Sequence, residues 1–147
     1  LKGMPLTVLG LGDCEQIEDL SPLQGMALTE LELQSSQVTD LSPLHGMPLT
    51  HLEVSRRVSD LLPLRGMPLV YLVVNSSSVT DLSPLEGMSL EKLYFYPWNI
   101  ETGLEIVRSM PSLKRLGIHG HTNTWTPKEF WKKFDAGELT EEAFSTW

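Results

Sequence analysis

A short leucine motif recurs six times along this chain of 147 residues. Each copy reads leucine, two residues, leucine, one residue, and then an aliphatic or aromatic residue. Because a unit of about 21 residues cannot bury its own leucines, a period this regular predicts similar units stacked into one array. The copies lie 22, 21, 20, 21 and 23 residues apart and begin at Leu6, Leu28, Leu49, Leu69, Leu90 and Leu113.

Each period has two halves with different patterns. The first half alternates, as in Leu31-Glu32-Leu33, which predicts a short strand with one buried face. The second half reads Asp-Leu-Ser-Pro-Leu, as at residues 40–44, and a glycine follows the proline three residues later. A serine cap, a proline at the first helical position and a glycine stop leave room for one 3-10 turn. The sequence therefore predicts parallel strands connected through 3-10 turns.

The repeats also predict which side chains fill the core. The methionines that follow the glycines recur at the same period, and core filling explains them better than a plastic binding groove. The lone cysteine, Cys14, lies at a turn position where a buried structural thiol is expected. The predicted first row of the core is Leu9, Leu31, Leu52, Leu72, Leu93 and Leu116, and the methionine row is Met4, Met26, Met47, Met67, Met88 and Met110.

Two repeats depart from the pattern. The third repeat is one residue short between Val54 and Val58, and it has Leu62 where other repeats have serine. The fifth repeat lacks the Ser-Pro turn, and Leu104 and Val107 recur there near helical spacing. We therefore expect a longer helix after the fifth strand.

The repeat pattern ends at residue 118, and residues 119–125 are polar and irregular. Thr126 and Glu129 then form a capping-box pattern, with Pro127 at the first helical position and Gly137 as a stop. The sequence predicts a helix over residues 127–135 that covers the last repeat with Phe130, Trp131 and Phe134. We interpret residues 1–147 as a single domain, with six repeats in 1–118 and a C-terminal cap in 119–147.

The sequence of the repeats resembles that of a known family. Residues 39–52 resemble bacterial leucine-rich repeats with short convex turns. Residues 99–113 and 129–137 are similar to the closing segment of planctomycete-type repeat regions, which in that family often follow a serine/threonine protein kinase domain. The resemblance implies an α/β leucine-rich repeat solenoid, with a parallel concave sheet and short 3-10 or helical convex turns. The chain itself has no G-x-G-x-x-G, H-R-D or D-F-G kinase motif.

In such a fold the outward strand positions line the concave face, and here those positions are graded in charge. Acidic residues come early, whereas cations and tyrosines come later, a combination typical of interface anchors. The alternative is that strand tyrosines reflect β-propensity alone. The predicted partner-binding residues are Glu30, Glu32, His51, Glu53, Tyr71, Lys92, Tyr94, Tyr96, Arg115 and His119.

The sequence offers little support for catalysis or for a metal site. Aspartates at the start of each convex turn could mimic a calcium ladder, but local backbone bonds explain them better. His51, His119 and His121 could share a zinc ion, yet a fourth ligand is missing. No G-x-S-x-G, P-loop or H-E-x-x-H motif occurs. We therefore expect no enzyme activity, no metal and no cofactor.

Composition narrows the possible partners. A net charge of −8 and a pI of about 4.9 argue against nucleic-acid binding. No apolar run is long enough to cross a bilayer, so we expect no membrane partner. One cysteine allows no intrachain disulfide, which favours a reducing, cytoplasmic setting. Because the repeat pattern is already running by Gly3, we expect that the true N-terminus is missing and that the chain is a fragment.

These observations favour a protein-interaction module, cut from a larger bacterial protein, that presents a concave leucine-rich repeat surface. The alternative is an architectural or regulatory extension of a neighbouring kinase-like domain, without a ligand of its own.

Overall fold

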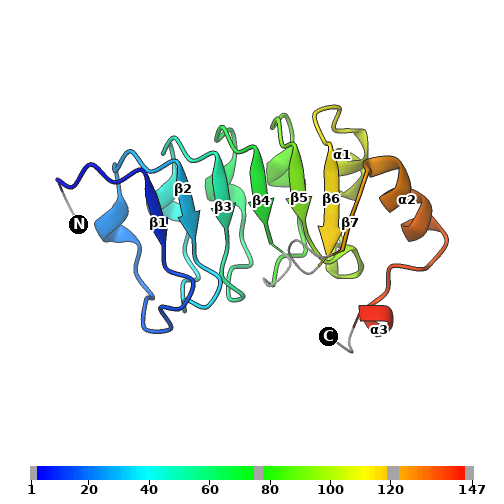
Figure 1. Cartoon of the computed structure of the whole chain (residues 1–147), viewed down its shortest axis with the longest axis horizontal. Helices are drawn as coiled ribbons and strands as arrows, with labels where there is room; N and C mark the ends of the chain where they lie inside the picture. The colour runs from blue at the N-terminus through cyan, green and yellow to red at the C-terminus, as the bar shows by residue number, and fades with distance from the viewer. Residues whose placement is uncertain (1–2, 75–77, 119–122, 145–147) are drawn as a thin grey trace.

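The computed structural model describes residues 3–74, 78–118 and 123–144. It is an α/β structure in which seven strands form one sheet, arranged in the order of the chain (Figure 1). Neighbouring strands among the first six pair in parallel, whereas the last pair is antiparallel. The strands are β1 (Val8–Gly10), β2 (Glu30–Glu32), β3 (His51–Glu53), β4 (Tyr71–Val73), β5 (Lys92–Tyr94), β6 (Arg115–Ile118) and β7 (Asn123–Trp125).

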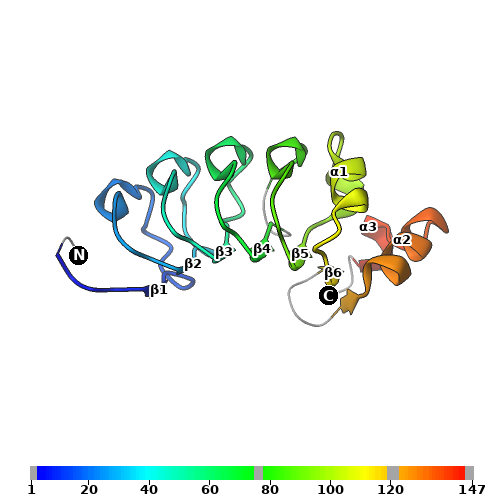
Figure 2. The same ribbon diagram turned by 90° about the horizontal axis from the view of Figure 1, so that it is seen from above.

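The strand–turn unit repeats as predicted, and the first four 3-10 turns form a row on the opposite side of the molecule from the sheet (Figure 2). Each of the first four turns is a single 3-10 turn with proline at its second residue. This repeated pattern is compatible with a solenoid-like layout. The turns of this row are η1 (Ser21–Leu23), η2 (Ser42–Leu44), η3 (Leu62–Leu64) and η4 (Ser83–Leu85), and a fifth 3-10 turn, η5 (Pro97–Asn99), lies in the loop directly after β5.

An aspartate lies two residues before the first residue of each of the turns η1 to η4. The Asp40 Oδ1 atom accepts a hydrogen bond of 2.8 Å from the Ser42 backbone N–H, and the Ser42 hydroxyl donates to the same oxygen. Both bonds lower the pKa of Asp40, and the bond from the Ser42 hydroxyl has the larger effect. Asp60 keeps the backbone bond, at 2.8 Å from the Leu62 N–H, although Leu62 brings no hydroxyl. The aspartates thus have the local structural role that the sequence favours.

The main core lies between the sheet and the turns. Strand register places the predicted leucine row in line, because Leu31 pairs with Leu52 and Leu72 pairs with Leu93. Five of the six leucines in this row are 0–1% exposed, and the sixth, Leu9, is partly buried. The row of methionines is buried only from Met47 onward; Met26 is half-buried and Met4 is 53% exposed. The prediction of core filling is therefore wrong for Met4, which lies beside the outermost repeat.

A helix takes the place of the Ser-Pro turn in the fifth repeat, next to η4. Helix α1 (Leu104–Ser109) follows Gly103, whose φ is 90°. A Cβ atom at Gly103 would also lie 2.6 Å from the Ser83 nitrogen, so both the backbone conformation and the space require glycine there. The expectation of a longer helical segment in this repeat is confirmed.

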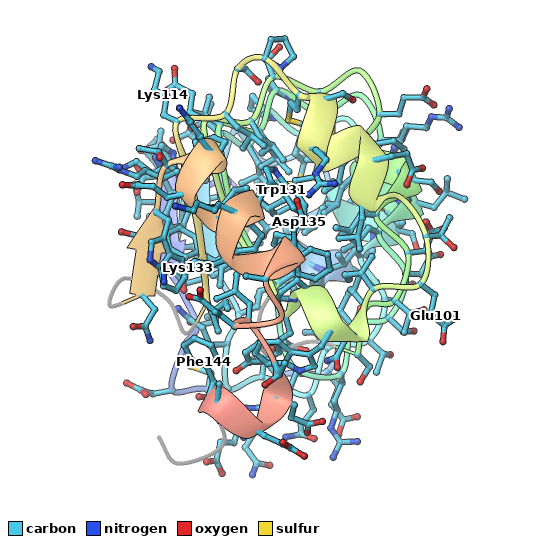
Figure 3. The ribbon with its side chains drawn as sticks, turned by 90° about the vertical axis from the view of Figure 1, so that its right-hand side faces the viewer. Glu101, Lys114, Trp131, Lys133, Asp135 and Phe144 are labelled. Carbon is cyan, nitrogen blue, oxygen red and sulfur yellow. The ribbon has the colours of Figure 1, made fainter. Side chains whose placement is uncertain are left out.

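The C-terminal helix forms where the capping box predicts it. Helix α2 (Pro127–Asp135) begins after Thr126, and both hydrogen bonds of the box are present. Phe130 and Trp131 are buried, and the helix packs on β6 and β7. Figure 3, which looks onto this end of the molecule, shows α2 lying across it. The predicted helix bounds are confirmed.

One strand at this end of the molecule was not expected. The segment predicted to be irregular contains β7, which pairs antiparallel with β6 through Gly117 and Thr124. A short helix, α3 (Glu141–Phe144), follows α2. Phe144 stacks on Trp98 with ring centroids 5.9 Å apart, and Trp98 stacks on Tyr96 at 5.0 Å.

Candidate interaction surface

Two rows of side chains cross the sheet on the face opposite the main core. We call them outer row one and outer row two. Strand pairing sets their members side by side, about 4.8 Å apart per strand. Figure 2 shows the sheet bending so that this face is concave. Outer row one is Val8, Glu30, His51, Tyr71, Lys92 and Arg115, and outer row two is Gly10, Glu32, Glu53, Val73, Tyr94 and Gly117.

The rows carry the predicted charge gradient. Glu30 and Glu32 on β2 are exposed, and Glu53 on β3 is half-buried. Lys92 and Arg115, on β5 and β6, are exposed. One end of the surface is therefore acidic and the other basic, with aromatic residues between them.

The tyrosines between these charges are not the exposed anchors that the sequence predicts. Tyr71 is 8% exposed and Tyr94 is 4% exposed. Their ring centroids lie 5.5 Å apart, and together with Val73 they form a small apolar cluster separate from the main core. Burial raises the pKa of both hydroxyls, and the Glu53 carboxylate adds to the effect.

Gly117 explains how Tyr94 becomes buried. A Cβ atom at Gly117 would lie 2.6 Å from Tyr94 Cδ1 and 2.8 Å from the Asn123 carbonyl oxygen on β7. The missing side chain therefore lets the Tyr94 ring cover β6 while β7 approaches from the other side. The sequence does contain a signal for this burial, because strand register pairs Gly117 with the aromatic Tyr94.

Glu53 joins the acidic part of the surface to the tyrosines. Its Oε1 atom accepts a hydrogen bond of 3.2 Å from the Tyr71 hydroxyl, and its Oε2 atom accepts one from Gln34 Nε2. The His51 ring stacks on Tyr71, with centroids 5.5 Å apart and planes at 22°. Gln34 was not among the predicted site residues, because its role depends on a partner 19 residues away.

The two remaining predicted residues do not join this arrangement. Tyr96 is half-buried and packs against the main core, where it stacks on Trp98. Burial raises the pKa of the Tyr96 hydroxyl, and the charge of Arg56 opposes this shift. His119 lies outside the described residues, as does His121.

Nothing in the described part of the chain builds a metal site, since no group of three or more His, Cys, Asp or Glu residues there is placed to hold an ion. Cys14 is free and exposed, so the prediction of a buried thiol is wrong. It lies in the loop of the first repeat, where Leu9, Leu11 and Ile17 are also only partly buried.

No family model matches the sequence, and the search of curated proteins finds no match. Within the residues that the structure describes, no helix is long and apolar enough to cross a membrane.

Proposed function

We propose that this chain is a protein-interaction module of the bacterial leucine-rich repeat class and that it binds a protein partner through the outer rows. The repeat motif and the resemblance of its closing segment support the class. The period of about 21 residues fits a leucine-rich repeat solenoid. The resemblance also supports a bacterial, kinase-associated origin, and the single cysteine, which allows no intrachain disulfide, supports a cytoplasmic setting; both are parts of this proposal.

One observation carries the proposed role. Exposed charges of opposite sign stand at the two ends of one continuous surface, Glu30 and Glu32 at one end and Lys92 and Arg115 at the other. Each lies on a paired strand, so its backbone is held by the sheet. A surface of this kind favours a partner with a basic segment and an acidic segment at matching spacing, because charge complementarity sets register and steers association.

The buried tyrosines change how the surface would contact a partner. Tyr71 and Tyr94 present little area of their own, but they hold neighbouring polar groups in place. Tyr71 contacts both His51 and Glu53, which therefore project from a fixed apolar base. Such pre-organisation reduces the entropy that binding would otherwise cost.

We propose no catalytic role. One pair in the described residues resembles a nucleophile and its base, because Thr50 Oγ1 lies 3.0 Å from His51 Nδ1. The same hydroxyl also donates to the Thr29 carbonyl oxygen at 3.2 Å, just as Thr29 Oγ1 donates to the Thr7 oxygen at 3.1 Å. This repeated bond between neighbouring repeats indicates a structural role for the threonine.

A second candidate function is an architectural extension of a neighbouring kinase-like domain. One observation favours it: Val8 on β1 is 56% exposed and Met4 is 53% exposed, so apolar area is available at the end where the sheet begins. A domain packed there would need no ligand on the outer rows.

The two candidates are separated by capture experiments with charge variants. The bait is the whole chain, and the test variant is Glu30→Gln/Glu32→Gln/Lys92→Gln/Arg115→Gln. The matched control changes charges beside the turns, as Glu86→Gln/Arg65→Gln, two exposed residues that directly follow η4 and η3.

Quantitative mass spectrometry compares the captured proteins. The interaction role predicts at least a tenfold loss of a partner with the outer-row variant and full capture with the turn variant. Equal capture by wild type and outer-row variant would contradict it. Circular dichroism must first show that all baits are folded.

A further inference from the structure

The short third repeat changes how its loop is held. In the second repeat the Gln37 N–H donates to the Ile17 carbonyl oxygen at 2.8 Å, and in the fourth the Ser78 N–H donates to the Val58 oxygen at 2.9 Å. The corresponding bond of the third repeat would join Arg57 to Val38. With one residue missing, the Arg57 N–H instead donates to Ser55 Oγ at 3.2 Å, and that hydroxyl donates to the Val38 oxygen.

A pocket lies beside this loop. The pocket has a volume of about 380 Å³ and lies among the loops that follow β1, β2 and β3. In Figure 1 these loops run along the edge below the arrowheads. Its lining includes Glu15, Gln34, Ser35, Gln37, Arg56 and Arg57.

The pocket walls carry strong hydrogen-bond donors in Arg56 and Arg57, together with the acidic Glu15. Arg56 and Arg57 are exposed, and neither forms an ion pair with a described residue. Arg108, Lys114 and Lys133 each pair with a carboxylate, whereas Arg65 and Lys92, like the two pocket arginines, form no ion pair with a described residue. In a chain with a net charge of −8, two adjacent arginines that share a pocket and form no ion pair with a described residue are a local positive site. The planar guanidinium fork matches the oxygens of phosphate and carboxylate groups.

We infer that this pocket binds an oxyanion, with a phosphate monoester as the ligand class that fits it best. The Arg56 and Arg57 side chains would neutralise the charge of the phosphate. The Ser35 hydroxyl and the Gln37 amide would donate to its remaining oxygens. Two arginines favour a phosphate group over a single carboxylate because a phosphate monoester carries about two negative charges near neutral pH.

Glu15 gives the inference a sharp test. Its carboxylate lines the same pocket and repels an anion. If the ligand is an oxyanion, Glu15→Gln must strengthen binding. If the pocket instead takes a cation or an amine, the same change must weaken binding.

The experiment is an NMR titration of the whole chain with inorganic phosphate, with chloride at equal ionic strength as the reference. The expected result is saturable binding that perturbs the amides of residues 34–37 and 56–57. Arg56→Gln and Arg57→Gln should each weaken it about tenfold, the size expected for losing one charged hydrogen bond. Arg65→Gln is the matched control, because Arg65 is also exposed and lies outside the pocket lining.

Two further arms complete the test. Glu15→Gln should tighten phosphate binding, whereas Glu18→Gln, an exposed carboxylate outside the lining, should leave it unchanged. A phosphoserine peptide and its unphosphorylated form show whether the phosphate is preferred free or carried by a protein chain. The inference is overturned if no saturable binding occurs up to about 50 mM phosphate, if Arg65→Gln weakens binding as much as the pocket variants, or if Glu15→Gln weakens it.

Discussion

Single residues explain where the repeats depart from regularity, and Ser55 is the clearest case. It is 0% exposed although it is polar and lies in the loop that follows β3. Its hydroxyl replaces a backbone bond that the missing residue removes. A polar group buried in this way must stay paired, because an unpaired buried donor or acceptor is costly.

Ser55→Ala should therefore lower the free energy of unfolding by about 1–3 kcal/mol, since the Val38 oxygen and the Arg57 N–H both lose their partner. Urea unfolding measures the change. Ser59→Ala is the control, because Ser59 is exposed. Equal stability of the two variants would show that the relay does not hold the loop.

Gly117→Ala should also destabilise the fold, by about 1–3 kcal/mol, because the added methyl group meets Tyr94 and the Asn123 carbonyl. Gly10→Ala is a matched control in outer row two, where a Cβ atom would make an ordinary contact of 3.5 Å with Glu32. The urea midpoints of both variants are compared with wild type. A Gly117 variant as stable as the Gly10 variant would contradict the packing described here.

The tyrosines make a prediction about alkaline pH. All three tyrosines of the chain have a raised pKa, with burial as the first cause, against an ordinary value of 10.0. A group whose pKa is raised on folding holds its proton more tightly in the folded state. Stability is therefore full below pH 10 and falls as the pH rises above it. Tyrosinate absorbance should rise only above pH 10 in native protein, and a midpoint that does not move in denaturant would contradict this.

At the scale of elements, the sequence predicted structure that depends on neighbouring residues but missed structure that depends on contacts between distant residues. Helix α2 was predicted with its observed bounds because its cap, proline and stop are all neighbours in sequence. The strand β7 was missed because Asn123-Thr124-Trp125 has no alternating pattern of its own and forms by pairing with β6. The burial of Tyr71 and Tyr94 was missed for a related reason, since it depends on contacts across strands.

Helix α2 supplies a prediction of its own. Trp131 is 8% exposed; its ring packs edge-on against Phe130 and Phe134, and Arg108 lies 4.7 Å from the ring centroid. Trp131→Ala should cost about 3 kcal/mol of unfolding free energy, as expected for a large buried aromatic. Thermal melting compares it with Lys132→Ala, an exposed change on the same helix. A wild-type melting temperature for Trp131→Ala would show that α2 does not stabilise this end of the array.

At the scale of the whole molecule, the sheet presents one surface with its charges separated by sign. The sequence was sufficient to predict the order of the six parallel strands and the gradient from Glu30 to Arg115, because period and register determine both. It was insufficient to predict the pocket beside Arg56 and Arg57, which depends on how three loops of unequal length meet. The binding role proposed for the outer rows therefore rests on geometry and charge together.

Carboxyl footprinting of the complex with a captured partner tests that role most directly. A carbodiimide reagent labels exposed glutamates, and mass spectrometry measures each site in the free and the bound chain. The account predicts that the partner protects Glu30 and Glu32 on the outer rows and leaves Glu18 and Glu86, exposed residues outside these rows, labelled as in the free chain. Protection of Glu18 or Glu86 with full labelling of Glu30 and Glu32 would contradict it.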